Sequence, residues 1–231
     1  MSFYQSINKY YDNIFPLNFK QVEFVKSFFE ENATLIEVGC ANGKLTNALS
    51  DFEIMGIDLE SSFIKEASQR YPHIKFRAMN MLDLDSLNQR FDGIVCVGNT
   101  LVHLDKEQIG KFIEKANASL NPRGKLLLQI LNYDFIVEKE ITELPLIDND
   151  VITFKRTYSF EDTLKFKTKL SIKESNEVIE NVINLHPIGK FELEEVLKHN
   201  GFEEITFYSS FAKDEYTFNK LPLVISAQKK S

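Results

Sequence analysis

Short apolar runs alternate with helically spaced apolar positions along the first 131 residues of the chain. The runs have the length and composition of buried strands, and they cover residues 34–40, 53–59, 74–81, 93–98 and 125–131. Helical spacing predicts helices over residues 18–31, 43–50, 61–71 and 109–120. Because strands and helices alternate, the pattern predicts a parallel sheet with right-handed crossovers and helices on both faces.

Particular residues mark the faces and ends of these elements. The helix over 18–31 is expected to bury one face, made of Phe19, Val22, Val25, Phe28 and Phe29. Ser61 or Ser62 is the expected cap of the helix that follows. Residues 121–124, Asn-Pro-Arg-Gly, have the composition of a turn before the fifth strand.

The pattern becomes β-rich after residue 150. Residues 151–160, 163–172 and 177–188 read as strands with turn signals between them, which predicts an antiparallel meander inserted into the α/β frame. A helix over 191–202 is expected to close at Gly201, in the C′ position. Strands over 205–211 and 221–228 then complete the sheet.

Length, composition and charge favour a single domain without a nucleic-acid partner. A chain of 231 residues that is 43% hydrophobic can form one sizeable core and is short for two α/β domains, so residues 1–231 are predicted to form one domain. The net charge of −7 disfavours binding to phosphate backbones. Four lysines spaced for one strand face form either a solvated surface or a patch that steers a ligand: Lys165, Lys167, Lys169 and Lys173.

Several features favour a cytoplasmic location. Residues 1–15 contain no continuous apolar stretch of the kind found in signal peptides. No run approaches the roughly 18 apolar residues that a membrane span requires, so no membrane partner is expected. Cys40 and Cys96 lie in apolar segments and are expected to be reduced, buried thiols.

A glycine-rich turn after the first strand carries the clearest chemical signal. The segment Glu37-Val38-Gly39-Cys40-Ala41-Asn42-Gly43 joins a strand to a helix, where glycines let the backbone approach a nucleotide-like ligand. Its spacing differs from the G-x-G-x-x-G of dinucleotide sites. Glu37 would repel a pyrophosphate but suits a cationic amino-acid group, so the turn favours S-adenosylmethionine over NAD.

Three further strand ends carry polar residues. Asp58 ends the second strand about 20 residues beyond the turn, where a carboxylate can bind both ribose hydroxyls. Asn80-Met81 ends the third strand and could meet an adenine edge. Gly98-Asn99 follows the fourth strand, near the switch point where such sheets bind ligands.

Each of these residues also has a structural explanation. Tight turns use glycine in any case, Asp58 alone could cap a helix, and Asn80 alone could be a satisfied turn residue. Polar or glycine-rich ends on four successive strands are harder to explain in this way. The set therefore predicts a cofactor site.

With these motifs, the chain resembles class I methyltransferases that use S-adenosylmethionine. The resemblance covers most of the chain and implies a Rossmann-like sheet of seven strands, mostly parallel with an antiparallel last strand. Within that superfamily the chain is most similar to the glycine N-methyltransferase type, through CVGNTLVHL (96–104), NYDFIV (132–137) and the inserted meander. The aromatic segment YYDNIFP (10–16) is similar to the part that folds over the cofactor in related enzymes.

The resemblance implies roles for individual residues. Val97 and Gly98 would border the cofactor, and Asn99 would lie beside the transferred methyl and the acceptor amine. His103 would lie in the following turn, where a core or capping role is favoured. The candidate cofactor-binding residues are then Glu37, Gly39, Cys40, Ala41, Gly43, Asp58, Leu59, Asn80, Met81, Val97 and Gly98, and the candidate catalytic residue is Asn99.

The acceptor is the part of the function that the sequence defines least. Glycine N-methyltransferases carry an arginine before N-Y-D that grips the substrate carboxylate, whereas this chain has Leu131, which cannot form that bidentate pair. Arg156 and Tyr158 of the meander are candidate acceptor contacts, although a strand-face role is favoured for each. No metal site is expected, because no cluster of His, Cys and Asp has ligand spacing.

The favoured function is methyl transfer to a small-molecule nitrogen. Transfer to a small-molecule oxygen, an NAD-dependent oxidoreductase, and a non-catalytic protein that binds S-adenosylmethionine remain the alternatives. The segment Gly98-Asn99-Thr100 contains no strong base, so an amine acceptor is expected to arrive neutral or to lose its proton to water.

Overall fold

The computed structural model describes residues 3–161 and 163–231 of the chain. Its main sheet has seven strands in the order β10-β11-β5-β4-β1-β2-β3. The strands are β1 (Thr34–Val38), β2 (Glu53–Asp58), β3 (Lys75–Ala78), β4 (Phe91–Cys96), β5 (Leu120–Leu131), β10 (Phe202–Tyr208) and β11 (Pro222–Lys229). Strand β11 pairs antiparallel with both β5 and β10, while the pairs among β1 to β5 are parallel. The predicted Rossmann-like sheet is confirmed.

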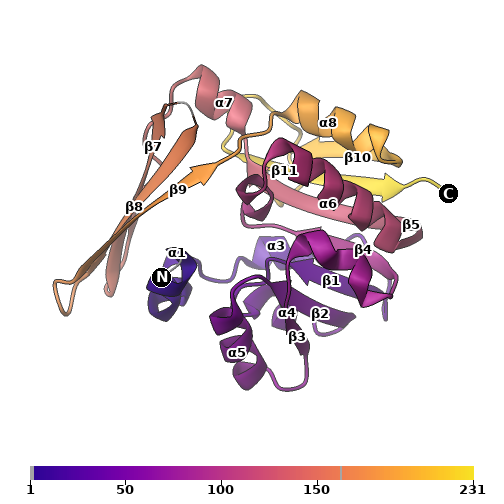
Figure 1. Ribbon diagram of the computed structural model, residues 1–231, viewed down its shortest axis with the longest axis horizontal. Coiled ribbons are helices and arrows are strands. Elements are labelled where there is room, and N and C mark those ends of the chain that lie inside the picture. Colours follow the sequence, from indigo (N-terminus) through magenta and orange to yellow (C-terminus); the bar gives the residue numbers. More distant parts are fainter. Residues whose placement is uncertain (1–2, 162) are drawn as a thin grey trace.

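Helices cover both faces of this sheet (Figure 1). In chain order they are α1 (Phe3–Ile7), η1 (Asn8–Tyr10), α2 (Tyr11–Ile14), α3 (Phe19–Lys26), α4 (Lys44–Ala48), α5 (Ser61–Arg70), η2 (Met81–Leu87), η3 (Thr100–His103), α6 (Lys106–Ser119), α7 (Tyr133–Glu138) and α8 (Lys190–His199). Alternate residues of the central strands point to opposite faces: Leu126 and Leu128 pack with α6 and α8, whereas Leu127 packs with α3 and α4.

The predicted meander is a separate antiparallel sheet. Its strands are β6 (Ile147–Asp148), β7 (Ile152–Phe160), β8 (Leu164–Ile172) and β9 (Val178–Leu185), paired in that order. In Figure 1 the arrow of β11 points away from this second sheet. The parallel strands run in the opposite direction to β11, so their C-terminal ends lie on the side of the meander and of the N-terminal helix α1. The meander therefore stands at the edge of the main sheet where the candidate site is expected.

Several predicted boundaries are wrong at the ends of elements. Neither Ser61 nor Ser62 caps α5, because Glu60 occupies the N-cap position and no side chain bonds there. Helix α6 begins at Lys106, three residues before the prediction, because Asp105 and Gln108 form a capping box. The predicted turn 121–124 lies inside β5, with Arg123 in a left-handed conformation at φ 61°.

Helix α3 is shorter than predicted, and it buries Val22 and Val25 as predicted. It ends at Lys26, where the Ser27 hydroxyl bonds the Phe24 carbonyl oxygen at 2.7 Å. Phe24 is buried and stacks on Phe28 beyond the helix end, while Phe19 is 73% exposed.

The C-terminal elements are shifted by a few residues from their predicted ranges. Helix α8 ends at His199, and β10 begins at Phe202, three residues before the predicted strand. Gly201 does take the C′ position, at φ 81°.

Candidate functional site

The turn from β1 to α4 has little room for side chains at its glycines. A Cβ on Gly39, where φ is 74°, would come within 2.5 Å of Thr100 Cγ2, and one on Gly43 would come within 2.6 Å of Phe76. Ala41 adopts a left-handed φ of 46°, a backbone conformation that favours glycine. The turn therefore presents its backbone, rather than side chains, at the edge of the sheet.

Asp58 ties this turn to the loop after β2. Its Oδ2 accepts the Ala41 N–H at 2.8 Å, and its Oδ1 accepts the Glu60 N–H at 2.9 Å. Burial raises the pKa of Asp58, although these N–H donors oppose the rise. Each oxygen keeps a second lone pair, and the neighbouring Leu59 is 70% exposed. The structure thus brings a hydrogen-bond acceptor and an exposed apolar surface together.

Glu37 lies beneath the same turn and is only 4% exposed. Its carboxyl accepts the Thr46 hydroxyl at 2.5 Å. Burial, reinforced by the nearby charge of Asp58, raises the pKa of Glu37 to about 8. A cation close to this carboxyl would favour its ionised form and reverse that shift.

The end of β3 has a different geometry from the one predicted. The strand ends at Ala78, and Asn80 is the N-cap of η2, whose Oδ1 accepts the Leu82 N–H at 3.0 Å. Asn80 is thus satisfied as a cap. Contact of Asn80 and Met81 with an adenine edge stays a prediction.

Beyond β4, Gly98 opens onto free space while Asn99 is held by the protein. Gly98 has φ 74°, and a Cβ there would meet nothing within 4 Å. The Asn99 Nδ2 donates to the Tyr133 hydroxyl at 2.8 Å, and its Oδ1 accepts the Leu131 N–H at 2.9 Å. Asn99 therefore joins the end of β4 to the end of β5. One lone pair of its side-chain oxygen remains for an acceptor, whose binding stays a prediction.

Tyrosines close over this edge of the sheet, and sequence reasoning assigned no role to them individually. The Tyr4 hydroxyl bonds His103 Nε2 at 2.8 Å, and the rings of Tyr4 and Tyr11 both pack on Phe63, with centroids 6.1 and 4.8 Å away. Burial raises the pKa of both hydroxyls, and the charge of Asp58 adds to the rise. The aromatic character of residues 10–16 is the signal that indicated this cover.

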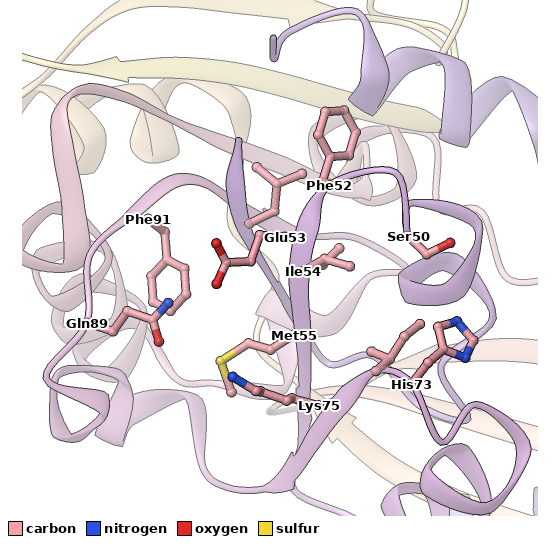
Figure 2. Close-up of a pocket in the computed structure, with 11 residues that line it drawn as sticks. Ser50, Phe52, Glu53, Ile54, Met55, His73, Lys75, Gln89 and Phe91 are labelled. Atoms are coloured by element: carbon pink, nitrogen blue, oxygen red, sulfur yellow. The ribbon is translucent and has the colours of Figure 1, made fainter. Parts of the chain in front are cut away.

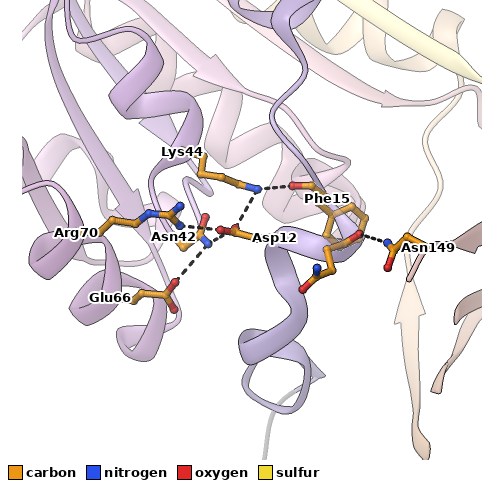
Figure 3. Close-up of polar contacts among 8 residues, drawn as sticks. Asp12, Phe15, Asn42, Lys44, Glu66, Arg70 and Asn149 are labelled. Carbon is orange, nitrogen blue, oxygen red and sulfur yellow. Dashed lines mark hydrogen bonds and ion pairs between the residues drawn. The ribbon is translucent and has the colours of Figure 1, made fainter. Parts of the chain in front are cut away.

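A polar clasp holds the N-terminal segment in place (Figure 3). The Asp12 carboxylate pairs with Lys44 at 2.9 Å and with Arg70 at 2.7 Å, and it accepts the Asn42 amide at 2.6 Å. Burial alone would raise the pKa of Asp12, but these three partners outweigh it and lower the pKa to about 2. The N-terminal segment is thereby fastened to the cofactor turn and to α5.

A cavity of about 200 Å³ lies at the opposite edge of the sheet (Figure 2). Its lining includes Glu53, Lys75 and Phe91, which are the first residues of β2, β3 and β4. The candidate residues lie instead beyond the other ends of these strands. The cavity is therefore separate from the candidate site.

Comparison with known proteins assigns the central part of the chain. Residues 35–124 match the family model of the methyltransferase domain. This part of the chain therefore resembles a methyltransferase domain. The matched region contains every candidate cofactor residue, from Glu37 to Gly98, and also Asn99.

Individual relatives agree with this assignment. The chain is similar to a glycine/sarcosine N-methyltransferase of Aphanothece halophytica, with 24% identity over 140 residues, covering 54% of this chain and 46% of the relative. This chain spans between 25% and 62% of the length of three other curated relatives that it matches.

Solved structures extend the similarity to the whole chain. An S-adenosylmethionine-dependent methyltransferase of Clostridium acetobutylicum aligns over 100% of both chains with a TM-score of 0.83 and 15% identity. CalS10, an amino pentose methyltransferase from Micromonospora echinaspora whose structure has bound S-adenosylmethionine, aligns over 100% and 99% with a TM-score of 0.75 and 15% identity. The meander and the N-terminal cover thus belong to the shared fold.

Among residues 3–161 and 163–231, no group of three or more His, Cys, Asp or Glu side chains is arranged to hold a metal ion. No helix in the same ranges combines the length and the apolar character that crossing a membrane requires.

Proposed function

We propose that this chain is an S-adenosylmethionine-dependent methyltransferase whose acceptor is a small molecule, with nitrogen as the methylated atom. The observation that carries the proposal is the edge formed by the turn after β1, Asp58 and Gly98, within the region that matches the methyltransferase domain. Residues 1–231 act as one domain in this proposal, and the meander over about 151–188 encloses the acceptor.

The residues at this edge suit S-adenosylmethionine. Asp58 has free lone pairs for ribose hydroxyls, Leu59 offers an exposed apolar surface for a base, and Gly98 leaves space where a side chain would intrude. The Glu37 carboxyl beneath the turn would ionise beside a cation, which suits the ammonium group of this cofactor, whereas the pyrophosphate of NAD offers no such cation. Bound here, S-adenosylmethionine would supply a methyl group already activated by its sulfonium.

The role of the protein is then to align the acceptor, which can contribute several kcal/mol to lowering the barrier. Asn99, held by Tyr133 and the Leu131 N–H, can accept a hydrogen bond from an amine through its remaining lone pair. Burial lowers the pKa of His103, whose Nε2 is bonded to Tyr4. We therefore assign no proton transfer to His103, and the acceptor amine binds neutral or loses its proton to water.

Nitrogen is favoured over oxygen on two grounds. The site has an amide oxygen rather than a strong base at the place assigned to the acceptor, which suits a neutral amine better than a hydroxyl. Two relatives are named for amine-bearing substrates, a glycine/sarcosine N-methyltransferase and an amino pentose methyltransferase. A cytoplasmic location is part of the proposal and rests on the two buried free thiols, Cys40 and Cys96.

The test is an assay with methyl-labelled S-adenosylmethionine and a small-metabolite extract, followed by mass identification of the labelled product. We expect one methylated amine, and loss of product with Asp58→Ala. The matched control is Glu60→Gln, which removes a neighbouring charge and leaves the Asp58 carboxylate in place. Labelling of oxygen would favour the O-methyltransferase alternative. Cofactor binding without any labelled product would favour a non-catalytic binding protein and overturn the proposed activity.

A further inference from the structure

One cross-strand row breaks the apolar inner face of the meander. That face packs Ile152 and Phe154 of β7 and Leu170 of β8 against the N-terminal segment. Two residues further along β7, Arg156 takes the next position on the same face and pairs in register with Thr168 of β8. Asn181 of β9 pairs with Thr168 from the other side, and its amide donates to the Ser6 hydroxyl at 3.0 Å. A row of three polar residues thus crosses an otherwise apolar surface.

Arg156 and Thr168 each have a buried donor without a hydrogen-bond partner. Thr168 is 4% exposed, and its Oγ1 bonds no protein atom. The Nε of Arg156 is likewise buried and unpaired, while its Nη2 donates to the Pro145 carbonyl oxygen at 2.7 Å. Burial also lowers the pKa of Arg156, and no carboxylate in the described ranges forms an ion pair with it. A buried donor without a partner is costly in free energy, and native proteins rarely leave one unpaired.

The pair lies next to the residues assigned to methyl transfer. Tyr158 is the next residue on the same face of β7, about 7 Å along the strand. It is buried in one cluster with Tyr133, and the Tyr133 hydroxyl accepts from Asn99. Arg156 thus lies on the same strand face as Tyr158, whose cluster includes the tyrosine that holds Asn99.

We propose that the methyl acceptor carries an anionic oxygen group, a carboxylate or a phosphate, which binds to Arg156 and Thr168. This inference rests on the proposed function and names the chemical class of its acceptor. An oxyanion accepts hydrogen bonds from both the Nε–H of Arg156 and the hydroxyl of Thr168, and it neutralises a partly desolvated cation. Leu131 supplies no charge at the end of β5, so the meander provides the cation from another direction.

The charge of the product tests this inference directly. The labelled product from the extract is passed over an anion exchanger at a pH where amines are neutral, before and after treatment with alkaline phosphatase. We expect retention: a product that stays retained after phosphatase carries a carboxylate, and one that is released carries a phosphate. A labelled product that is not retained overturns the inference while leaving the proposed function intact. Absence of any labelled product overturns the proposed function, and this inference with it.

Variants of the meander then test the two residues on the purified acceptor. Arg156→Gln is expected to lower kcat/KM at least about 10-fold and Thr168→Val several-fold, because each removes a donor to a charged group. The matched control is Lys155→Gln, which removes a charge from the adjacent residue, on the outer face, and is expected to change kcat/KM by less than about twofold. Calorimetry with S-adenosylhomocysteine, expected to be unchanged in all three, verifies folding. Unchanged kcat/KM in Arg156→Gln would contradict the proposal.

Discussion

Replacing Glu37 by glutamine separates the charge of this residue from its shape. In the free protein burial raises the pKa of Glu37 to about 8, so at pH 7 about nine-tenths of the molecules have it protonated. If the carboxylate binds the ammonium of the cofactor, it must ionise when the cofactor binds. Binding should then release about 0.9 proton at pH 7.

The magnitude follows from the same pKa. One pKa unit corresponds to about 1.4 kcal/mol, so cofactor affinity should fall about fivefold from pH 8 to pH 7 and about tenfold for each further pH unit. Because half of the molecules are already protonated at pH 8, the Kd for S-adenosylhomocysteine should rise about 50-fold between pH 8 and pH 6 in the native chain. Glutamine can still accept the Thr46 hydroxyl bond but has no proton to release, so the variant should bind more weakly at pH 8 and show no such slope.

Glu37→Gln should affect the stability of the cofactor-free protein in the opposite direction from its effect on cofactor binding. The folded-state pKa of Glu37 lies above its ordinary value of 4.5, so its contribution is fully present below pH 4.5 and is lost as pH rises through about 8. Glu37→Gln should therefore raise the Tm of the cofactor-free protein at pH 8. The same substitution would thus stabilise the fold and weaken the site.

The assay is calorimetry with S-adenosylhomocysteine at pH 6, 7 and 8, in two buffers of different ionisation enthalpy. Glu53→Gln is the matched control, because Glu53 is exposed at the first position of β2, on the opposite edge of the sheet. A native Kd that stays constant from pH 6 to pH 8, or a slope that persists in Glu37→Gln, would refute the assigned role of Glu37.

Three further predictions concern the rest of the site. Asp58→Ala should weaken S-adenosylhomocysteine binding by about 1.5–3 kcal/mol, the range for a hydrogen bond to a charged group, and a loss under twofold by calorimetry would count against the ribose contact. Asn99→Ala should lower kcat more than His103→Ala does. The rate should follow the titration of the acceptor amine, without a second limb near pH 6–7. If His103→Ala abolished turnover at normal cofactor affinity, His103 would instead be a general base. Asp12→Asn should speed amide hydrogen exchange in α1 and α2 and the release of S-adenosylhomocysteine. The loss of stabilising free energy should be about 1 kcal/mol, because the ion pairs of Asp12 are partly exposed. Unchanged exchange would show that the clasp does not hold the N-terminal segment.

The order of elements could be predicted from the sequence because each strand of the main sheet is a distinct apolar run. The meander was predicted at nearly its observed bounds, since its strands are β-rich and separated by turn signals. Boundaries set by side-chain capping were harder to predict. The capping box at Asp105 moves the start of α6, and the stacking of Phe28 on Phe24 replaces the helical turn predicted there.

The sequence predicted which residues gather at the candidate site, but it could not predict the hydrogen-bond partners of those residues. Strand ends reveal which residues gather at one edge, whereas the partners of Asn99 come from residues more than 30 positions away. The four-lysine face is now better explained as a solvated surface, because Lys165, Lys169 and Lys173 pair with nearby acids. The unpaired donors of Arg156 and Thr168 required the register of β7 and β8, which no periodicity in the sequence defines.

The central claim is that the edge formed by the turn after β1, Asp58 and Gly98 binds S-adenosylmethionine. Calorimetry of the purified chain with S-adenosylhomocysteine and, separately, with NAD tests it most directly, because S-adenosylhomocysteine shares every contact except the transferred methyl and is not consumed. The account predicts saturable heat with S-adenosylhomocysteine, weakened in Asp58→Ala, and no heat with NAD. Binding of NAD together with no heat and no thermal shift from S-adenosylhomocysteine would contradict it.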